Sequence, residues 1–300
     1  MLELFSGLGA AGLAWGLPVH AAIDQSANAN AAYALSHGLQ PKAWNLVGVR
    51  AAQLAPFSAE PWWMSPPCQP FTVRGARRDL EDPRTRALLR VLDLLVELRP
   101  PVVAMENVPG FVESTTRGHL RATLIGAGYT LSERLLCPTA LGIPMRRQRY
   151  YLVAQRDGDG RHRADFAPPP PIAPIRPIAA FLDPEPDPEL TVDEALVRAH
   201  GHSVHFLDTT DPTEIANCFT SAYGRSNVRS GSYLRDRGVV RRFSPEEVVR
   251  LLGFPSTWTF PPELSREARW DLAGNSLTVD GVRRVLGDAG VLPVGVGAGG

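Results

Sequence analysis

Short apolar stretches alternate with helical ones through the first half of the chain, and several apolar stretches end in glycine or polar residues. Strands are expected at residues 2–5, 19–24, 44–49, 61–65 and 102–108. A helix is expected at residues 84–98, where leucines recur at helical spacing. Further along the chain, a strand is expected at residues 129–136, a helix start at Ser244, and another helix at residues 265–272. This alternation predicts an α/β fold with a largely parallel sheet. Because such sheets bind ligands beyond the carboxyl ends of their strands, the functional residues are expected there.

The composition bounds the size of the fold and the kind of partner. A chain of 300 residues with 44% hydrophobic content can bury one large α/β domain with a smaller appendage. The formal net charge is zero, so any basic surface must be local. Cys68, Cys137 and Cys218 are odd in number and far apart, which argues against a disulfide framework and for a reducing compartment. With no signal peptide and no membrane-spanning apolar run, a cytoplasmic protein without a membrane partner is expected, as a monomer.

Cys68 is the first candidate for catalysis. It stands in Ser-Pro-Pro-Cys-Gln at residues 65–69, directly after an expected strand. A single cysteine more often packs as a small hydrophobic residue. The balance changes because another strand delivers Glu106 and Asn107 at its carboxyl end. A thiol and a carboxyl group would then share one crevice.

The two stretches around Cys68 and Glu106 together resemble the catalytic pair of the cytosine-5 methyltransferases. The resemblance covers most of the chain apart from a central segment, as an ordered set of motifs. It implies a Rossmann-like, S-adenosylmethionine-dependent methyltransferase sheet with a small target-recognition domain. It also implies that Cys68 attacks the cytosine, that Glu106 acts at ring nitrogen 3, and that Gln69 and Asn107 contact the substrate.

A cofactor site is indicated by Leu-Phe-Ser-Gly-Leu-Gly at residues 4–9, where glycines let the backbone approach a ligand. A plain strand-to-helix turn would explain the glycines alone, and Asp24 could simply cap the next helix. By the resemblance, these residues bind S-adenosylmethionine and release S-adenosylhomocysteine. Where relatives carry an acid, residues 44–49 offer none, which leaves the adenine contact there open. The implied cofactor-binding residues are Phe5, Gly7, Leu8, Gly9, Asp24, Gln25, Ser65, Asn275 and Ser276.

An arginine motif precedes the expected strand near residue 150. Arg147 and Arg149 match two arginines of the family, whereas Met145 stands where many members have glutamine, so that contact is not carried over. A solvated basic turn is the alternative. A guanidinium directed into the crevice could hold a phosphate or the target base, and both arginines are counted as catalytic. Either arginine could also lower the pKa of Cys68 and so favour its thiolate.

One branch of the family is indicated by Cys-Phe-Thr at residues 218–220, followed by tyrosine and glycine. This stretch resembles the "DNA methyltransferase 2" proteins, which methylate transfer RNA. The resemblance implies that Cys218, Phe219 and Thr220 bind the substrate. Taken singly, Cys218 would be read as a buried residue.

The domain organisation follows from a shift in composition after residue 156, where proline, glycine and charge predominate, with a proline run at residues 168–171. Residues 1–155 with 241–292 are expected to form the catalytic domain, 156–240 the target-recognition domain, and 293–300 a frayed tail.

A polar loop with Arg74, Arg77 and Arg78 is a candidate lid, or only a solvated loop. Residues 200–205 contain three histidines, but no cysteine or carboxylate completes a metal site, and no metal is expected.

The sequence therefore predicts a cytosine-5 methyltransferase of the RNA branch, with the anticodon loop of aspartate transfer RNA as the implied substrate. Its short recognition segment fits RNA better than a sequence-reading DNA domain. A DNA methyltransferase of a restriction or regulatory system is the alternative, since it would share every catalytic residue. A third hypothesis is a nucleic-acid-binding protein with an inactive methyltransferase fold. The intact Cys68 and Glu106 speak against that hypothesis.

Overall fold

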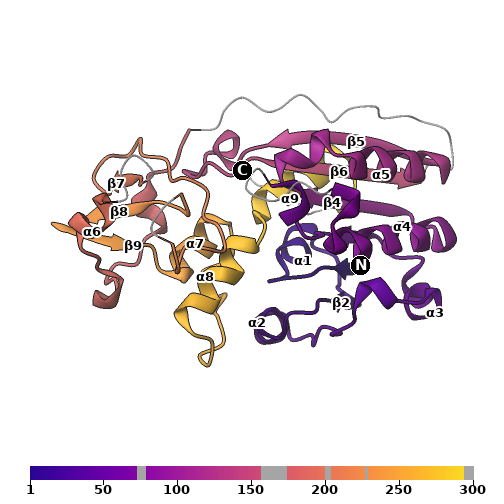
Figure 1. Cartoon of the computed structure of the whole chain (residues 1–300), viewed down its shortest axis with the longest axis horizontal. Helices are drawn as coiled ribbons and strands as arrows, with labels where there is room; N and C mark the ends of the chain where they lie inside the picture. Colours follow the sequence, from indigo (N-terminus) through magenta and orange to yellow (C-terminus); the bar gives the residue numbers. More distant parts are fainter. Residues whose placement is uncertain (73–78, 157–173, 200–203, 227–228, 294–300) are drawn as a thin grey trace.

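The computed structural model describes residues 1–72, 79–156, 174–199, 204–226 and 229–293. A six-stranded sheet forms the larger body, and a three-stranded sheet lies at the other end of the molecule (Figure 1). The large sheet has the order β2-β1-β3-β4-β6-β5. Its strands are β1 (Leu2–Leu4), β2 (Ala21–Ile23), β3 (Trp62–Met64), β4 (Val102–Asn107), β5 (Tyr129–Leu136) and β6 (Arg149–Arg156).

The order of strands in the large sheet determines where a ligand can bind. The chain passes from β1 to β2 on one side, and then returns to place β3 on the other side of β1, all three parallel. This reversal opens a crevice beyond the carboxyl ends of β1 and β3. Strand β6 runs antiparallel to both β4 and β5, so its amino end returns to the same edge.

Helices cover both faces of the large sheet. Trp62 and Trp63 of β3 point to opposite faces, as successive strand residues do, and belong to two separate apolar clusters. Trp63 packs with α1 and α9, and Trp62 packs with α3, α4 and α5. The helices of this body are α1 (Ala10–Trp15), α2 (Ala27–His37), α3 (Ala51–Leu54), α4 (Arg86–Leu98), α5 (Thr115–Gly126) and α9 (Val279–Asp288). The expected α/β class is confirmed.

The small sheet has the order β7-β8-β9, and α7 and α8 lie between it and the large body (Figure 1). Strand β9 crosses residue 240, where the recognition segment was expected to end, and Trp270 of α8 donates to the carbonyl of Phe243 just beyond β9. The division into two domains therefore stays a prediction. The elements are α6 (Glu194–Arg198), β7 (Phe206–Asp208), β8 (Tyr233–Asp236), β9 (Val239–Arg242), α7 (Pro245–Leu251) and α8 (Arg266–Asn275).

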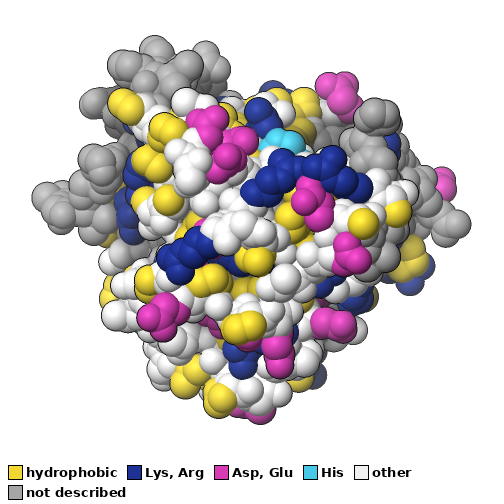
Figure 2. Space-filling model, turned by 90° about the vertical axis from the view of Figure 1, so that its left-hand side faces the viewer, with side chains coloured by type: hydrophobic (Ala, Val, Ile, Leu, Met, Phe, Trp, Pro, Cys, Tyr) yellow, Lys and Arg dark blue, Asp and Glu magenta, His cyan; other side chains and the backbone are white. Residues whose placement is uncertain are grey.

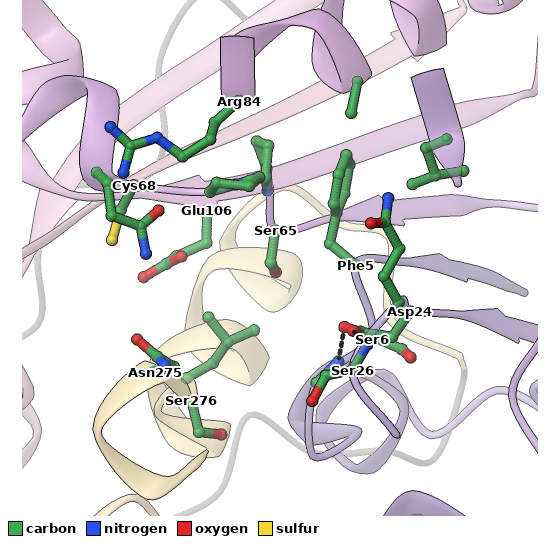
Figure 3. A pocket seen from close by; sticks show the side chains of 18 of the residues that line it. Phe5, Ser6, Asp24, Ser26, Ser65, Cys68, Arg84, Glu106, Asn275 and Ser276 are labelled. Carbon is green, nitrogen blue, oxygen red and sulfur yellow. Dashed lines mark hydrogen bonds between the residues drawn. The ribbon is translucent and has the colours of Figure 1, made fainter. Parts of the chain in front are cut away.

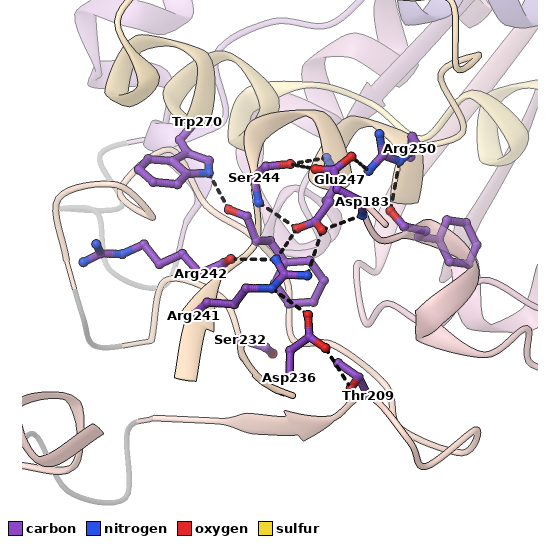
Figure 4. Close-up of polar contacts among 12 residues, drawn as sticks. Asp183, Thr209, Ser232, Asp236, Arg241, Arg242, Ser244, Glu247, Arg250 and Trp270 are labelled. Atoms are coloured by element: carbon purple, nitrogen blue, oxygen red, sulfur yellow. Dashed lines mark hydrogen bonds and ion pairs between the residues drawn. The ribbon is translucent and has the colours of Figure 1, made fainter. Parts of the chain in front are cut away.

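A buried ion-pair network joins the small sheet to α7 (Figure 4). Arg241 contacts Glu247 through two bonds of 2.9 and 3.0 Å and Asp236 at 2.9 Å. Glu247 is fully buried and also accepts from the amides of Ser244 and Asp183. The expected helix start at Ser244 is confirmed, since its hydroxyl and Glu247 form a reciprocal cap. Every carboxylate oxygen of Glu247 thus has a partner.

Two expectations for the elements were wrong. Residues 44–49 form no strand: the Asn45 side chain accepts from the amide of Val47 and starts a 3-10 turn at Leu46–Gly48. Lys42, just ahead of this segment, pairs with the sheet through one bridge to Ile23. Helix α8 runs through Asn275 instead of ending at residue 272, so Asn275 is presented from a helix end.

Several expectations lie outside the described residues. These are the arginines of the candidate lid, Arg74, Arg77 and Arg78, the proline run at residues 168–171, His200 and His202, and residues 294–300 of the tail. Within the described part of the chain, no helix is long and apolar enough to cross a membrane.

Candidate active site

Cys68 lies in the loop that leaves β3, at the carboxyl edge of the large sheet. The loop is held at two places: the Ser65 amide donates to the carbonyl of Leu4 on β1, and the Asn107 side chain donates to the carbonyl of Pro66 at 3.2 Å. Asn107 is 1% exposed and also accepts from its neighbouring amide at Val108. Asn107 therefore supports the loop from below and lies outside the cavity walls described next.

Glu106 is the penultimate residue of β4, beside this loop, and is 7% exposed. Its Oε1 lies 3.1 Å from Nε of Arg149, the first residue of β6. Burial raises the pKa of Glu106 above its ordinary value, against the opposing charges of Arg149 and Arg147. The neutral carboxyl, which can donate a proton, is thereby favoured.

The pKa values of the two thiols of the site, Cys68 and Cys218, are shifted in opposite directions. Burial, and then the charge of Glu106, raise the pKa of Cys68, and Arg149 and Arg147 only partly oppose them. Burial would also raise the pKa of Cys218, but the same two arginines outweigh it and lower that pKa. Their Nη atoms lie 3.4 and 3.7 Å from the Cys218 sulfur. The expectation that these arginines could make Cys68 the acidic thiol is therefore not met in this geometry.

Arg147 is a buried cross-link between segments far apart in the chain. It is 3% exposed and donates to the carbonyls of Phe219 at 3.0 Å, Gly274 at 3.1 Å and Ser276. These contacts join the amino end of β6, the Cys-Phe-Thr stretch and the end of α8. Arg147 thus fixes the walls of the site, while Arg149 faces the carboxyl group of Glu106.

A cavity of about 650 Å³ opens at the reversal between β1 and β3, within the range of small-molecule sites. Cys68 and Glu106 lie at one end of it and Phe5 and Asp24 at the other (Figure 3). Of the residues expected to bind cofactor, Phe5, Gly7, Leu8, Asp24, Gln25, Ser65, Asn275 and Ser276 line this cavity. Gly9 does not: it caps α1 with φ of 79°, and a Cβ there would meet the ring of His37 at 2.3 Å.

The wall of this first cavity matches the chemistry of a nucleoside with a polar tail. Asp24 accepts from the amides of Gly7 at 2.9 Å and Ser26 at 2.8 Å, and each oxygen keeps a lone pair for a hydroxyl group. The buried hydroxyl of Ser6 has no partner within the described residues and lies on the same wall. The rings of Phe5 and Trp44 supply apolar surface. These groups fit S-adenosylmethionine.

A second cavity of about 840 Å³ meets the first at Cys68. Cys68, Gln69, Arg149 and Asn275 belong to both walls. The expected substrate-binding residues Cys218, Phe219 and Thr220 line the second cavity, although Phe219 is 1% exposed. Two spaces, one on each side of a thiol, can hold a methyl donor and an acceptor.

Some residues of the site were missed from the sequence. Arg84 lines the first cavity, and the carboxylate of Asp82 holds its guanidinium at 2.8 and 2.6 Å. Asp-Pro-Arg at residues 82–84, directly ahead of a helix, was an available signal. Arg146, His205 and Arg229 line the second cavity. No single stretch of sequence could have grouped these three.

The family model of the C-5 cytosine-specific DNA methylases matches residues 1–290. This chain belongs to that family. The methyltransferase is 32% identical over 313 residues to a "tRNA (cytosine(38)-C(5))-methyltransferase" of Schizosaccharomyces pombe, covering 93% of each chain. It is 28% identical to a "DNA (cytosine-5)-methyltransferase" of Dictyostelium discoideum, covering 95% of this chain and 93% of that one.

The fold agrees with that of a solved relative. The crystal structure of the S. pombe Dnmt2 methyltransferase superimposes with a TM-score of 0.81 at 30% identity, covering 96% of this chain and 97% of that one. The expected resemblance to the family and to its DNA methyltransferase 2 branch is confirmed. Members of the family use S-adenosylmethionine. In the described part of the chain, no group of three or more His, Cys, Asp or Glu side chains is arranged to hold a metal.

Proposed function

We propose that this methyltransferase transfers a methyl group from S-adenosylmethionine to carbon 5 of a cytosine in RNA, through a covalent adduct of Cys68. The position of Cys68, on the wall common to two cavities, is the observation that carries the proposal. The first cavity would hold the methyl donor and the second the target base. Residues 1–155 and 241–292 would supply the donor site, and residues 156–240 would recognise the nucleic acid.

The chemistry needs an attacking thiolate and an acid. Carbon 5 of cytosine is a poor nucleophile, and addition of the Cys68 thiolate to carbon 6 would turn the ring into an enamine. Glu106 would donate a proton to ring nitrogen 3 as charge develops there, which its raised pKa supports. S-adenosylmethionine supplies the methyl group. Loss of the carbon 5 proton to a base would then expel the thiolate and restore Cys68.

RNA is the favoured substrate class, and the anticodon loop of aspartate transfer RNA the specific one. The S. pombe relative is named for methylation of a transfer RNA. A target base must leave its stack to reach a buried thiol, which costs a few kcal/mol and least in a single-stranded loop. A DNA substrate is the second candidate, because the Dictyostelium relative is named a DNA methyltransferase.

The substrate class is tested with radiolabelled S-adenosylmethionine, offered with total transfer RNA and, in parallel, with unmethylated DNA. We expect label in the RNA, with aspartate transfer RNA as the major band after separation. Label confined to DNA would overturn the RNA assignment. Label in neither, from folded protein that binds the cofactor, would favour the inactive nucleic-acid-binding protein.

The role of Cys68 is tested by trapping. An RNA that contains 5-fluorocytosine at the target should form a stable adduct with the wild-type protein, because fluorine at carbon 5 blocks elimination. Cys68→Ser should form none, while its affinity for S-adenosylmethionine stays unchanged. Cys137→Ser is the matched control and should trap normally. Persistence of the adduct in Cys68→Ser would refute Cys68 as the attacking residue.

A further inference from the structure

The second cavity carries a cluster of basic groups that the catalytic chemistry does not use. Arg146, Arg229 and His205 line it together with Arg149, and none of its described lining residues is acidic. On the face at the small-sheet end, basic and acidic side chains are interspersed (Figure 2). The cavity is therefore a local basic site on a chain whose formal net charge is zero.

The two exposed arginines of this cluster, Arg146 and Arg229, make few contacts with the rest of the described protein. Arg146 reaches only the carbonyl of Ile215 at 3.4 Å, and no carboxylate within the described residues pairs with Arg146 or Arg229. Other arginines of the same region are paired, Arg225 with Asp271 and Arg235 with Glu194. Arg229 also has φ of 49°, a costly left-handed backbone for a residue with a side chain.

His205 adds an uncharged donor. Its Nδ1 lies 2.9 Å from Oγ of Ser232, which already accepts from the amide of Asn217. The buried Ser232 hydroxyl must place its proton somewhere, and Nδ1 is the acceptor in reach. The ring proton then sits on Nε2. Burial lowers the pKa of His205 below its ordinary value, against the opposing charge of Glu214, and so favours the neutral ring.

We propose that Arg146, Arg229 and His205 form a phosphate-binding wall that holds the RNA backbone on either side of the target cytosine. The inference rests on the proposed function and adds the residues that bind the phosphates of the substrate. The second cavity offers little surface for base stacking, because Phe219, the one Phe, Tyr or Trp side chain among its described lining residues, is 1% exposed. Binding would therefore depend on phosphate contacts, and it would weaken steeply with salt.

The test uses the full chain and a stem–loop RNA with a cytosine in its single-stranded loop. Affinity is measured by fluorescence anisotropy over a range of salt concentrations. Arg146→Gln and Arg229→Gln should each reduce the slope of log K against log salt by about 0.7, the value for one phosphate of a single strand. Arg198→Gln is the matched control, since it removes an exposed arginine of α6 that pairs with Glu194 and lies outside the cavity.

His205→Ala separates hydrogen bonding from charge. It should weaken RNA binding about fivefold, the worth of roughly one hydrogen bond, and leave the salt slope unchanged because the ring is neutral. The affinity for S-adenosylmethionine should stay at the wild-type value in all variants, which also reports that they fold. Unchanged salt slopes in both arginine variants would overturn the inference. A wild-type protein that binds neither this RNA nor duplex DNA would instead overturn the proposed function.

Discussion

The Nε of Arg149 lies 3.1 Å from Oε1 of Glu106, and this pair joins the start of β6 to the carboxyl end of β4. The antiparallel return of β6 makes the contact possible, because it brings an amino end to the edge where the parallel strands end. Burial and the arginine act on the carboxyl group in opposite directions, and burial prevails. Glu106 is thus oriented by a charge without being committed to the ionised form.

Replacing Glu106 with glutamine should remove the proton donor and keep the shape of the site. We expect methylation to fall by about 10²- to 10⁴-fold, the usual contribution of a general acid. Binding of S-adenosylmethionine, measured by calorimetry, should not change. The control is Glu113→Gln, an exposed carboxylate in the turn after β4. Activity of Glu106→Gln within tenfold of wild type would contradict the assigned role.

The two thiols of the site should titrate in opposite order. Because the pKa of Cys68 is raised and that of Cys218 is lowered, alkylation of Cys218 should level off at a lower pH than alkylation of Cys68. Mass spectrometry after brief iodoacetamide treatment, in a Cys137→Ser background, gives both profiles from one sample. The midpoint of each profile is compared, since absolute rates also depend on access. The reverse order of midpoints would show that the arginines act on Cys68 instead.

Glu3 should make stability depend on pH. It lies in β1, is 1% exposed and accepts from the Tyr33 hydroxyl at 2.8 Å, and burial raises its pKa to about 7. In the folded state it therefore keeps a proton that the unfolded chain has lost above about pH 4.5. Stability should fall as pH rises through this window, by about 3 kcal/mol from this group.

Urea unfolding of wild type and Glu3→Gln between about pH 5 and 8 tests this expectation. The difference between their two profiles isolates Glu3 from the other titrating groups. We expect the wild type to lose stability relative to the variant as pH rises. Parallel profiles would mean that Glu3 ionises at the same pH in the folded and unfolded chains.

Glu247→Ala should be severely destabilising, by about 3–5 kcal/mol, because it leaves the guanidinium of Arg241 buried with a reduced set of partners. Denaturant unfolding measures the change. Glu246→Ala is the matched control one residue away, where a half-exposed carboxylate contacts Arg269 at 3.3 Å. It should cost less than about 1 kcal/mol. Equal losses of unfolding free energy in the two variants would show that the buried network stabilises the fold no more than the exposed ion pair does.

Sequence reasoning succeeded where side chains determine the local backbone. The Ser244 cap and the strand Tyr129–Leu136 fall where they were expected. It failed at residues 44–49, where the strand-like composition was overridden by the Asn45 side chain, which holds the chain in a turn. Local preference decides such a segment only when no nearby side chain offers the backbone another partner.

The candidate site was predictable to a similar extent. Cys68 and Glu106 could be placed together because one follows a strand and the other lies at the carboxyl end of a strand, and parallel strands end at one edge. The cross-link formed by Arg147 could not be derived from strand ends, and neither could the phosphate-binding wall of Arg146, His205 and Arg229. Each depends on segments far apart in the chain, which only tertiary packing brings together.

The contacts of Arg147 have a thermodynamic consequence. One guanidinium donates to the carbonyls of Phe219, which lines the second cavity, of Ser276, which lines the first, and of Gly274, which lines both. Because this side chain contacts both walls, we expect a ligand in one cavity to change the affinity of the other cavity for its own ligand. Such coupling of affinities is reciprocal. Binding of one substrate should therefore change the affinity of this methyltransferase for the other before any covalent bond forms.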